Sequence, residues 1–412
     1  MRYLISLLLV LLLALASAQS GVLNYNSNAS DPEPKRVDEL LVEMFKEANP
    51  DINLEHTQVD HEGFKQAIRT YFASSSPPEV MTWFAGNRMR FFASRDVLLN
   101  LNDIWAENGW EDIYPKGFQA SSKYNGNYVF VPTSYYWWAV YYRKDVFSAL
   151  DLAIPQNWSE LLATCDALRD AGYVPFTIGT RFLWPTGGWF DYLNMRVNGP
   201  EFHTALTDGT VSYESEEVRA VFAHWKELLD HDCFIENPSA YNWQEAAEFM
   251  VKEKPEAVMY LMGDFIRDLY PDDREASELD FFRFPLINDV PVGEDAPTDG
   301  FFAAAEGEDQ ELAKRFLTFL GGKEAQEVVA RELGRIVPRN DVDPSLYPEY
   351  VQKGLDEIIN KADVVMQFYD RDTTPEMAQA GMNGFVEFMA NPNRIDRILQ
   401  QLERERQQIF GE

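Results

Sequence analysis

The segment GNYVFVPTSYYWWAVYYRKDVF, residues 126–147, carries six aromatic side chains in the eight positions from 135 to 142. In a β-strand, successive side chains point to opposite faces. One face would carry Tyr135, Trp137, Ala139 and Tyr141, and the other Tyr136, Trp138, Val140 and Tyr142. Such a run of rings fits a buried core strand, a belt at a membrane interface, or a platform on which a flat ligand stacks.

The chain around this segment has the composition of a large globular protein. Its 412 residues are enough for two or three domains, and 46% of them are hydrophobic. The formal net charge of −31 repels polyanions, so we expect neither nucleic acid nor an anionic membrane surface as a partner. The acidic residues are spread along the chain, which is typical of a solvated surface.

The first 18 residues have the pattern of a secretory signal peptide. Arg2 supplies the positive charge, residues 4–15 are apolar except for Ser6, and residues 16–18 (Ala-Ser-Ala) form a cleavage pattern. The alternative is an N-terminal membrane anchor, but the apolar run is shorter than the roughly 20 residues that span a bilayer. No cysteine follows the cleavage pattern, so no lipoprotein anchor is expected. We therefore expect export to the periplasm as a soluble protein, and the aromatic segment is not a membrane belt.

Two cysteines, Cys165 and Cys233, lie in the exported part of the chain. An oxidising compartment would allow one disulfide between them. Two buried thiols are the other interpretation, and the sequence leaves both open.

Strand-like and helix-like segments alternate along the mature chain, which indicates an α/β fold with largely parallel sheets. Strands are expected at residues 21–25, 52–54, 80–83, 174–180 and 256–265, and helices at 36–48, 61–72, 155–172, 215–232, 242–254 and 309–333. For the helix within residues 155–172, we expect Ser159 to be the N-cap and Gly172 to end the helix.

Eight segments in a fixed order resemble a known family. They are FKEANPDINLE (45–55), PPEVMTWFAG (77–86), the aromatic segment (126–147), IPQNWSELLATCDALRDAGYVPF (154–176), EAVMYLMGDF (256–265), FFRFPLI (281–287), ELAKRFLTFLGGKEAQE (311–327) and GRIVPRND (334–341). Together they resemble the bacterial extracellular solute-binding proteins of the sugar ABC-transporter family, which includes the maltose-binding protein. The matches cover nearly the whole mature chain.

The resemblance implies two α/β lobes of the class II type, each a mostly parallel sheet flanked by helices, with the ligand in a cleft at the hinge. The first lobe would comprise residues 19–132 and 287–339, and the second residues 133–286 and 340–412. The three crossings fall near residues 132–135, 286–289 and 338–341. By the same resemblance, the protein is a monomer that closes on a mono- or oligosaccharide and delivers it to the permease subunits in the membrane.

The resemblance also indicates which side chains meet the ligand. Sugars are held by aromatic rings against their C–H faces and by charged or amide groups against their hydroxyls. At the end of the strand at 80–83, Trp83 is followed by Asn87 and Arg88, which match a ring and a polar pair of the family. The alternative is that Trp83 packs beneath the loop and Arg88 is a surface charge.

Three further segments supply candidate ligand residues. Trp184 lies in a Gly/Pro-rich loop where the family often presents a stacking ring. Asp264 and Phe265 match the family's Gly-x-Trp position, with Phe in place of Trp, so stacking there is weaker or displaced; Asp264 could instead cap a helix. Asp299 matches a segment that supplies an aspartate to the sugar in some monosaccharide binders.

The aromatic segment divides at the first crossing. Tyr135, Tyr136 and one of Trp137 and Trp138 are expected to meet the ligand beside the cleft. Tyr141 and Tyr142 are expected to pack inside the second lobe. The sequence does not distinguish Trp137 from Trp138.

The sequence contains no recognisable catalytic or cofactor motif. Its five histidines lack metal-ligand spacing, and it has neither a phosphate-binding glycine loop nor a GxSxG motif. We therefore expect a receptor without enzymatic activity, cofactor or metal. Two alternatives stay open: a secreted carbohydrate-active enzyme, such as a glycosidase or lyase, and a receptor for a non-sugar solute such as a polyamine.

Overall fold

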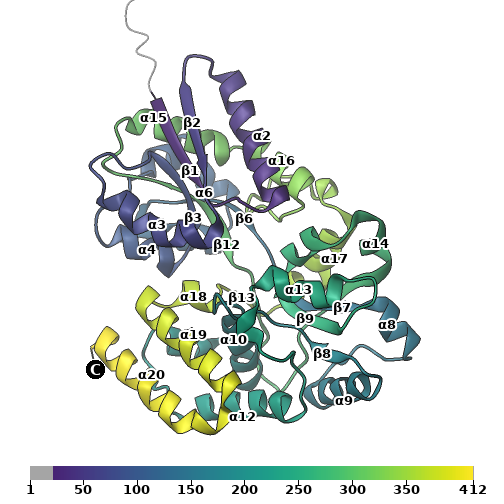
Figure 1. Ribbon diagram of the computed structural model, residues 1–412. Coiled ribbons are helices and arrows are strands. Elements are labelled where there is room, and N and C mark those ends of the chain that lie inside the picture. The colour runs from purple at the N-terminus through teal and green to yellow at the C-terminus, as the bar shows by residue number, and fades with distance from the viewer. Residues whose placement is uncertain (1–21, 412) are drawn as a thin grey trace, which may run out of the picture.

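Two β-sheets covered by helices form an upper and a lower lobe (Figure 1). The computed structural model describes residues 22–411, so the predicted signal peptide lies outside the described residues. Within residues 22–411, no helix is long and apolar enough to cross a membrane. The predicted two-lobed α/β fold class is confirmed.

The first lobe is built on a five-stranded sheet of order β2-β1-β3-β12-β6. Its strands are β1 (Val22–Ser27), β2 (Asn53–Gln58), β3 (Val80–Phe84), β6 (Val131–Tyr135) and β12 (Thr298–Ala303). Its helices are α2 (Pro32–Ala48), α3 (His61–Ala73), α4 (Asn87–Ala93), α5 (Asn102–Glu107), α6 (Trp110–Ile113), α7 (Lys116–Ser121), α15 (Gln310–Leu320) and α16 (Lys323–Val328), followed by the π-helical turn η3 (Val329–Leu333); a small hairpin joins β4 (Lys123–Tyr124) and β5 (Asn127–Tyr128). β1 runs parallel to β2 and β3, because the helices α2 and α3 bring the chain back to the end of the sheet at which the previous strand began.

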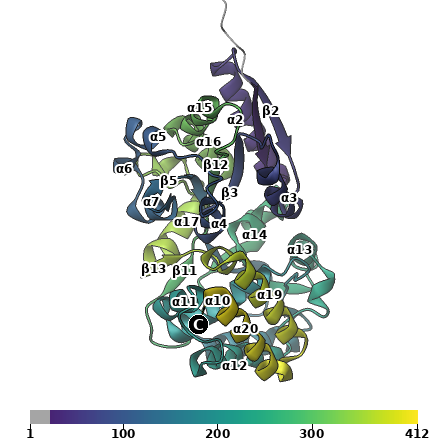
Figure 2. The ribbon, with the colours of Figure 1, turned by 90° about the vertical axis from the view of Figure 1, so that its left-hand side faces the viewer.

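The second lobe is built on a four-stranded sheet of order β10-β7-β9-β8. Its strands are β7 (Trp138–Arg143), β8 (Val174–Phe176), β9 (Ala257–Gly263) and β10 (Leu279–Phe282). Its helices are α8 (Lys144–Ala149), α9 (Trp158–Asp170), α10 (Pro185–Asn198), α11 (Pro200–Thr207), α12 (Glu216–Asp230), α13 (Trp243–Val251), α14 (Asp272–Glu278), α17 (Glu349–Glu357), α18 (Tyr369–Asp372), α19 (Pro375–Ala390) and α20 (Ile395–Phe410). Helix α10 is buried at 13 of its 14 residues and forms the centre of this lobe. α19 and α20 pack side by side on its outer surface (Figure 2).

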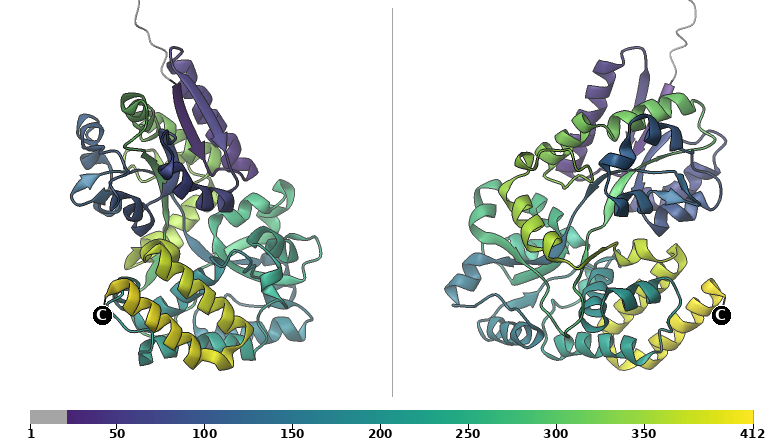
Figure 3. Two further views of the ribbon diagram at one scale, coloured as in Figure 1. Left: turned by 60° about the vertical axis from the view of Figure 1, so that its left-hand side comes forward. Right: turned by 180° about the vertical axis from the view of Figure 1, so that it is seen from behind.

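Extended segments connect the lobes, as the view from behind shows (Figure 3). β6 belongs to the first sheet and β7 to the second, so the first crossing lies at residues 136–137. The Tyr135 N–H donates to the Ile336 carbonyl at 2.8 Å, which joins the first crossing to the third. After the second lobe, β11 (Gly293–Asp295) still pairs with β13 (Val364–Met366) and packs on α10, and the chain enters the first sheet at Thr298 rather than near 286–289. The lobe boundaries proposed from the sequence stay a prediction.

The strand directions differ from the mostly parallel sheets that the sequence predicted. β12 runs antiparallel to both β3 and β6, and β7 runs antiparallel to both β9 and β10. The strands β6, β7 and β12 adjoin the crossings. A strand that enters a sheet directly from the opposite lobe is not preceded by a helical crossover within its own lobe. Helical crossovers make neighbouring strands parallel, so this strand need not be parallel to its neighbours.

Two local predictions, the N-cap of α9 and the state of the two cysteines, can be compared with the structure. Helix α9 begins at Trp158, and its N-cap is Asn157, whose side chain accepts from the Glu160 N–H; the prediction of Ser159 was wrong by two positions. The two cysteines, Cys165 and Cys233, are free thiols that are fully buried in the second lobe. Burial raises the pKa of the Cys165 thiol, which keeps it protonated.

Candidate ligand-binding site

A cavity of about 540 Å³ lies between the lobes and beside the hinge. Side chains from both lobes and from the first crossing line it. The first lobe contributes polar residues of the loop at 28–31 and of strand ends together with apolar side chains, and the second lobe contributes large rings beside several polar residues. A cleft with one polar and one aromatic wall suits a ligand that has both hydroxyl edges and apolar faces.

The aromatic wall is formed by four rings of the second lobe that meet at steep angles. Trp138 and Trp184 are perpendicular, with centroids 5.9 Å apart. Phe265 lies 5.0 Å from Trp243 and 6.2 Å from Trp184, again edge to face. Trp138 also stacks on Phe368 at 4.7 Å. These contacts hold the rings rigidly, so a ligand meets preformed apolar surfaces at more than one angle.

The choice between Trp137 and Trp138 is made by the strand alternation. Trp138 is the first residue of β7 and its ring lines the cavity. Trp137 is fully buried on the opposite side, where it contacts Phe281 and Tyr350 at 5.7 and 6.4 Å. Trp137 therefore fixes α17 to the second sheet, and Trp138, which is only 2% exposed, borders the cavity.

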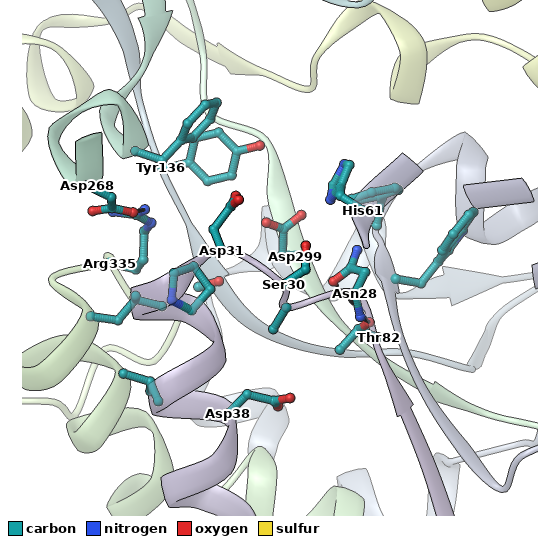
Figure 4. A pocket seen from close by; sticks show the side chains of 18 of the residues that line it. Asn28, Ser30, Asp31, Asp38, His61, Thr82, Tyr136, Asp268, Asp299 and Arg335 are labelled. Atoms are coloured by element: carbon teal, nitrogen blue, oxygen red, sulfur yellow. Dashed lines mark hydrogen bonds and ion pairs between the residues drawn. The ribbon is translucent and has the colours of Figure 1, made fainter. Parts of the chain in front are cut away.

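The polar wall begins in the loop that follows β1. Asn28, Ser30 and Asp31 lie there, close to Thr82 of β3 and Asp299 of β12 (Figure 4). The Asn28 N–H donates to the Thr82 hydroxyl at 2.9 Å, which ties the loop to the neighbouring strand. Asp31 occupies the N-cap position of α2 without capping it. Its carboxylate instead accepts from the Gln244 amide of the second lobe at 3.3 Å.

His61 faces the cavity from the start of α3 (Figure 4). Its pKa is lowered, first by burial and then by the positive charges of Lys65, Arg371 and Arg88. The imidazole is therefore neutral at pH 7, with one nitrogen that donates and one that accepts. Such a group can hydrogen-bond a hydroxyl in either direction.

Arg371 organises the centre of the site. Its guanidinium donates to the Asp299 carboxylate at 2.8 Å and to the Tyr136 hydroxyl at 2.9 Å, and it lies 4.2 Å from the centre of the Phe84 ring. Burial raises the pKa of Asp299, while Arg371 opposes that shift. Arg371 thus holds one oxygen each of Asp299 and Tyr136 in a fixed place beside the cavity.

A family model of bacterial extracellular solute-binding proteins matches residues 28–327. The chain is a bacterial extracellular solute-binding protein. It is a solute-binding protein of ABC transporters, as the eight sequence segments predicted.

The chain of this solute-binding protein is similar to several known proteins over almost its whole length. A solved structure of the bacterial solute receptor AcbH, described as having an exclusive preference for β-D-galactopyranose, is 30% identical, with a TM-score of 0.88 over 95% of this chain and 100% of that one. An uncharacterised ABC transporter extracellular-binding protein of Pyrococcus horikoshii is 24% identical to this chain. The match spans 96% of this chain and 94% of the Pyrococcus protein. Maltose-bound MalE3 of T. maritima has the same fold at 17% identity, with a TM-score of 0.78 over 94% of this chain and 100% of that one. The family and these neighbours are binding receptors.

Six of the eleven site residues that the sequence proposed line the cavity of this solute-binding protein. They are Trp83, Tyr136, Trp138, Trp184, Phe265 and Asp299. The remaining five are Asn87, Arg88, Tyr135, Trp137 and Asp264, and they lie outside the lining. Whether any of the eleven touches a ligand stays a prediction.

The residues outside the lining have other partners. Asn87 and Arg88 bind α18 of the second lobe. Tyr135 packs on Phe118 at 4.9 Å. Asp264 is fully buried 3.4 Å from Arg335, and burial raises its pKa to about 7 although Arg335 opposes the shift. Asp264 therefore lies beneath the aromatic wall and does not offer its carboxylate to the cavity.

Sequence reasoning missed part of the site. The missed residues include Asn28, Ser30, Asp31, His61, Trp243, Phe368, Asp370 and Arg371. The loop at 28–31 was accessible to prediction, because it follows the carboxyl end of β1, and Trp83 was proposed from its place near the carboxyl end of β3. Asp370 and Arg371 lie in a segment that none of the eight recognised motifs covers.

Gly188 of α10 permits the observed position of Trp138. A methyl group at Gly188 would lie 2.6 Å from Cζ3 of the Trp138 ring, which is too close for a rigid side chain. We expect Gly188→Ala to displace the ring, to lower the free energy of unfolding by about 1–3 kcal/mol through overpacking, and to weaken ligand binding by about tenfold. Gly117→Ala, where the added methyl has open space, is the matched control. Urea unfolding and titration calorimetry measure both effects, and unchanged affinity in Gly188→Ala would contradict this role of the ring.

Proposed function

We propose that this solute-binding protein captures a carbohydrate in the periplasm and delivers it, as a monomer, to the permease of an ABC importer. One observation carries the proposal: the aromatic wall and the polar loop at 28–31 lie on opposite sides of the cavity. The wall is formed by Trp138, Trp184, Trp243 and Phe265. A sugar has C–H faces for the rings and hydroxyl edges for the polar side chains. The galactose preference described for AcbH and the sugar-binding names of several relatives support the same ligand class.

The charges that line the cavity favour a neutral ligand over an anion. Among the described lining residues, each Lys or Arg already has a carboxylate partner: Lys65 pairs with Glu62 at 3.2 Å, Arg335 with Asp268 at 2.8 Å, and Arg371 with Asp299 at 2.8 Å. An anionic ligand would have to compete with these carboxylates for the cations. A neutral polyol needs only hydrogen bonds.

The proposed role involves no turnover, because the family and the similar structures are binding receptors. The enzyme alternative is not favoured by any relative. Hinge closure around the sugar is the step that the permease would recognise, since ligand contacts from both lobes stabilise the closed form.

A thermal-shift screen of mono- and oligosaccharides, with D-galactose in the first set, tests the proposal. A sugar at about 100 times its Kd should raise the free energy of unfolding by about 2.7 kcal/mol. Titration calorimetry then confirms binding, and chromatography of the recovered sugar should show it intact. Binding of a polyamine such as spermidine in place of every neutral sugar, or hydrolysis of the sugar, would overturn the proposal.

A further inference from the structure

Helix α4 of the first lobe docks directly on α18 of the second lobe. The Arg88 guanidinium donates to the Asp370 carboxylate at 2.8 Å and to the Asp370 carbonyl at 2.7 Å. Next to it, the Asn87 amide donates to the Asp372 carbonyl at 2.5 Å. The side chain of Arg88 is 16% exposed and that of Asp370 is 7% exposed. This is a nearly dry, charged contact between the two lobes.

The two partners differ in their relation to the cavity. Asp370 lines the cavity, whereas Arg88 is not among the residues that line it. Asp370 reaches the ligand site from the second lobe, but the guanidinium that orients its carboxylate comes from the first lobe. The two groups can meet only when the lobes are together.

We propose that Arg88 and Asp370 form an interlobe clasp that stabilises the closed form with or without ligand, with Arg88 as the positioning residue that presents Asp370 to the cavity. Closing the cleft removes the Asp370 carboxylate from water, which is costly unless a cation pairs with it. Arg88 supplies two charge-assisted hydrogen bonds in a fixed geometry. The clasp therefore adds to closure independently of what the cavity contains, and it goes beyond the proposed sugar-binding function.

The electrostatics of Asp370 support this assignment. Burial alone would raise the pKa of Asp370, but Arg88, Lys65 and Arg371 together hold it below its ordinary value. The charged and titratable groups that interact with it are Lys65 of α3, Arg88 of α4, Tyr136 of the first crossing, Asp191 of α10 and Arg371 of α18. Closure of the wild-type protein is therefore favoured by an ionised Asp370, and this contribution is lost as the pH falls through the pKa of the closed form.

In the Arg88→Gln variant, we expect part of the pH dependence of closure to have the opposite sign. Without the guanidinium, the pKa of Asp370 in the closed form is higher than in the wild-type protein, so the variant takes up a proton at a higher pH. The cost of closing is then largest near neutral pH and becomes smaller as the pH falls. The ratio of the Kd of Arg88→Gln to that of the wild-type protein should decrease from pH 7.5 to pH 5. A purely structural defect would give the same ratio at every pH.

The first test needs no ligand. Small-angle X-ray scattering of the ligand-free wild-type protein, Arg88→Gln and Asp370→Asn compares their radii of gyration at pH 7.5. We expect both variants to be larger than the wild-type protein, because the open form gains population. The control is Arg394→Gln, which removes an exposed ion pair within the second lobe. Equal radii for the wild-type protein and Arg88→Gln would overturn the proposal.

The second test measures D-galactose binding by calorimetry at pH 7.5 and pH 5. We expect Arg88→Gln to weaken binding by about tenfold or more at pH 7.5 and by less at pH 5. Arg88→Lys keeps the charge, so it should lose less affinity, by the same factor at both pH values, and it also checks that the position tolerates substitution. A pH-independent ratio for Arg88→Gln overturns the proposal. If the wild-type protein binds no sugar, the proposed function fails, and the scattering result alone decides on the clasp.

Discussion

Replacing Trp184 by alanine is expected to weaken ligand binding by about thirtyfold or more. Trp184 stands at the centre of the aromatic wall, within 6.4 Å of Trp138, Trp243, Phe265 and Phe368. Central aromatic anchors of a binding site typically contribute about 2 kcal/mol or more, and about 1.4 kcal/mol corresponds to a factor of ten in Kd. Because Trp184 is only partly buried, its loss should affect stability much less than affinity.

The control for this prediction is Trp137→Phe. Trp137 is adjacent to Trp138 in sequence but packs away from the cavity, so its substitution should change stability and leave affinity within about threefold of the wild-type value. Calorimetry with the sugar found in the screen measures both variants. If the Trp184→Ala protein bound the sugar as tightly as the wild type, the aromatic wall would not be part of the ligand-binding site.

The second large effect concerns stability. Arg196→Ala is expected to lower the free energy of unfolding by about 3–5 kcal/mol, as the loss of one partner from a buried ion pair does. Arg196 of α10 donates to the Glu294 carboxylate at 2.5 Å and to the Gly293 carbonyl at 2.5 Å, and both charged side chains are at most 1% exposed. Burial already raises the pKa of Glu294 against the effect of Arg196. Without Arg196, this carboxylate would be buried with only the more distant Arg283, at 3.9 Å, as a cationic partner.

Urea unfolding measures the effect, and two further variants interpret it. Arg196→Met combined with Glu294→Gln removes both charges, so it should recover part of the lost stability. Arg219→Ala removes an exposed ion pair with Asp396 and should cost less than about 1 kcal/mol. If Arg196→Ala alone lost no more than this surface control, Arg196 would not be the group that stabilises the second-lobe side of β11.

The aromatic segment shows how much the sequence could predict. Its strand alternation and its division at the first crossing were both readable, because periodicity depends only on local order. The strand-end rule proposed Trp83 and the family's motifs proposed Trp184, Phe265 and Asp299, and all four border the cavity. Deciding between Trp137 and Trp138 required knowing which face of β7 meets the cavity and which meets α17, and that depends on packing between segments about 200 residues apart.

The proposed residues that lie outside the cavity lining have partners that local sequence could not show. Asn87 and Arg88 have the chemistry of ligand residues, but their partners are on α18, more than 280 residues further along the chain. Asp264 has the right chemistry as well, but it points at Arg335 beneath the rings. A polar side chain at a strand end predicts that something will be bound there. Whether that partner is a ligand or another part of the chain is decided by tertiary structure.

The position of β12 in the first sheet has a consequence for how the chain folds during its synthesis. β12 lies between β3 and β6, yet it begins at Thr298, long after β6 has ended at Tyr135. Until residues 298–303 emerge, β3 and β6 each have an unpaired inner edge, and the sheet cannot close. Pairing over such a sequence distance is slow. In a growing chain the first sheet therefore stays incomplete until β12 has been synthesised, and its two exposed edges are the surface that a holding chaperone would protect.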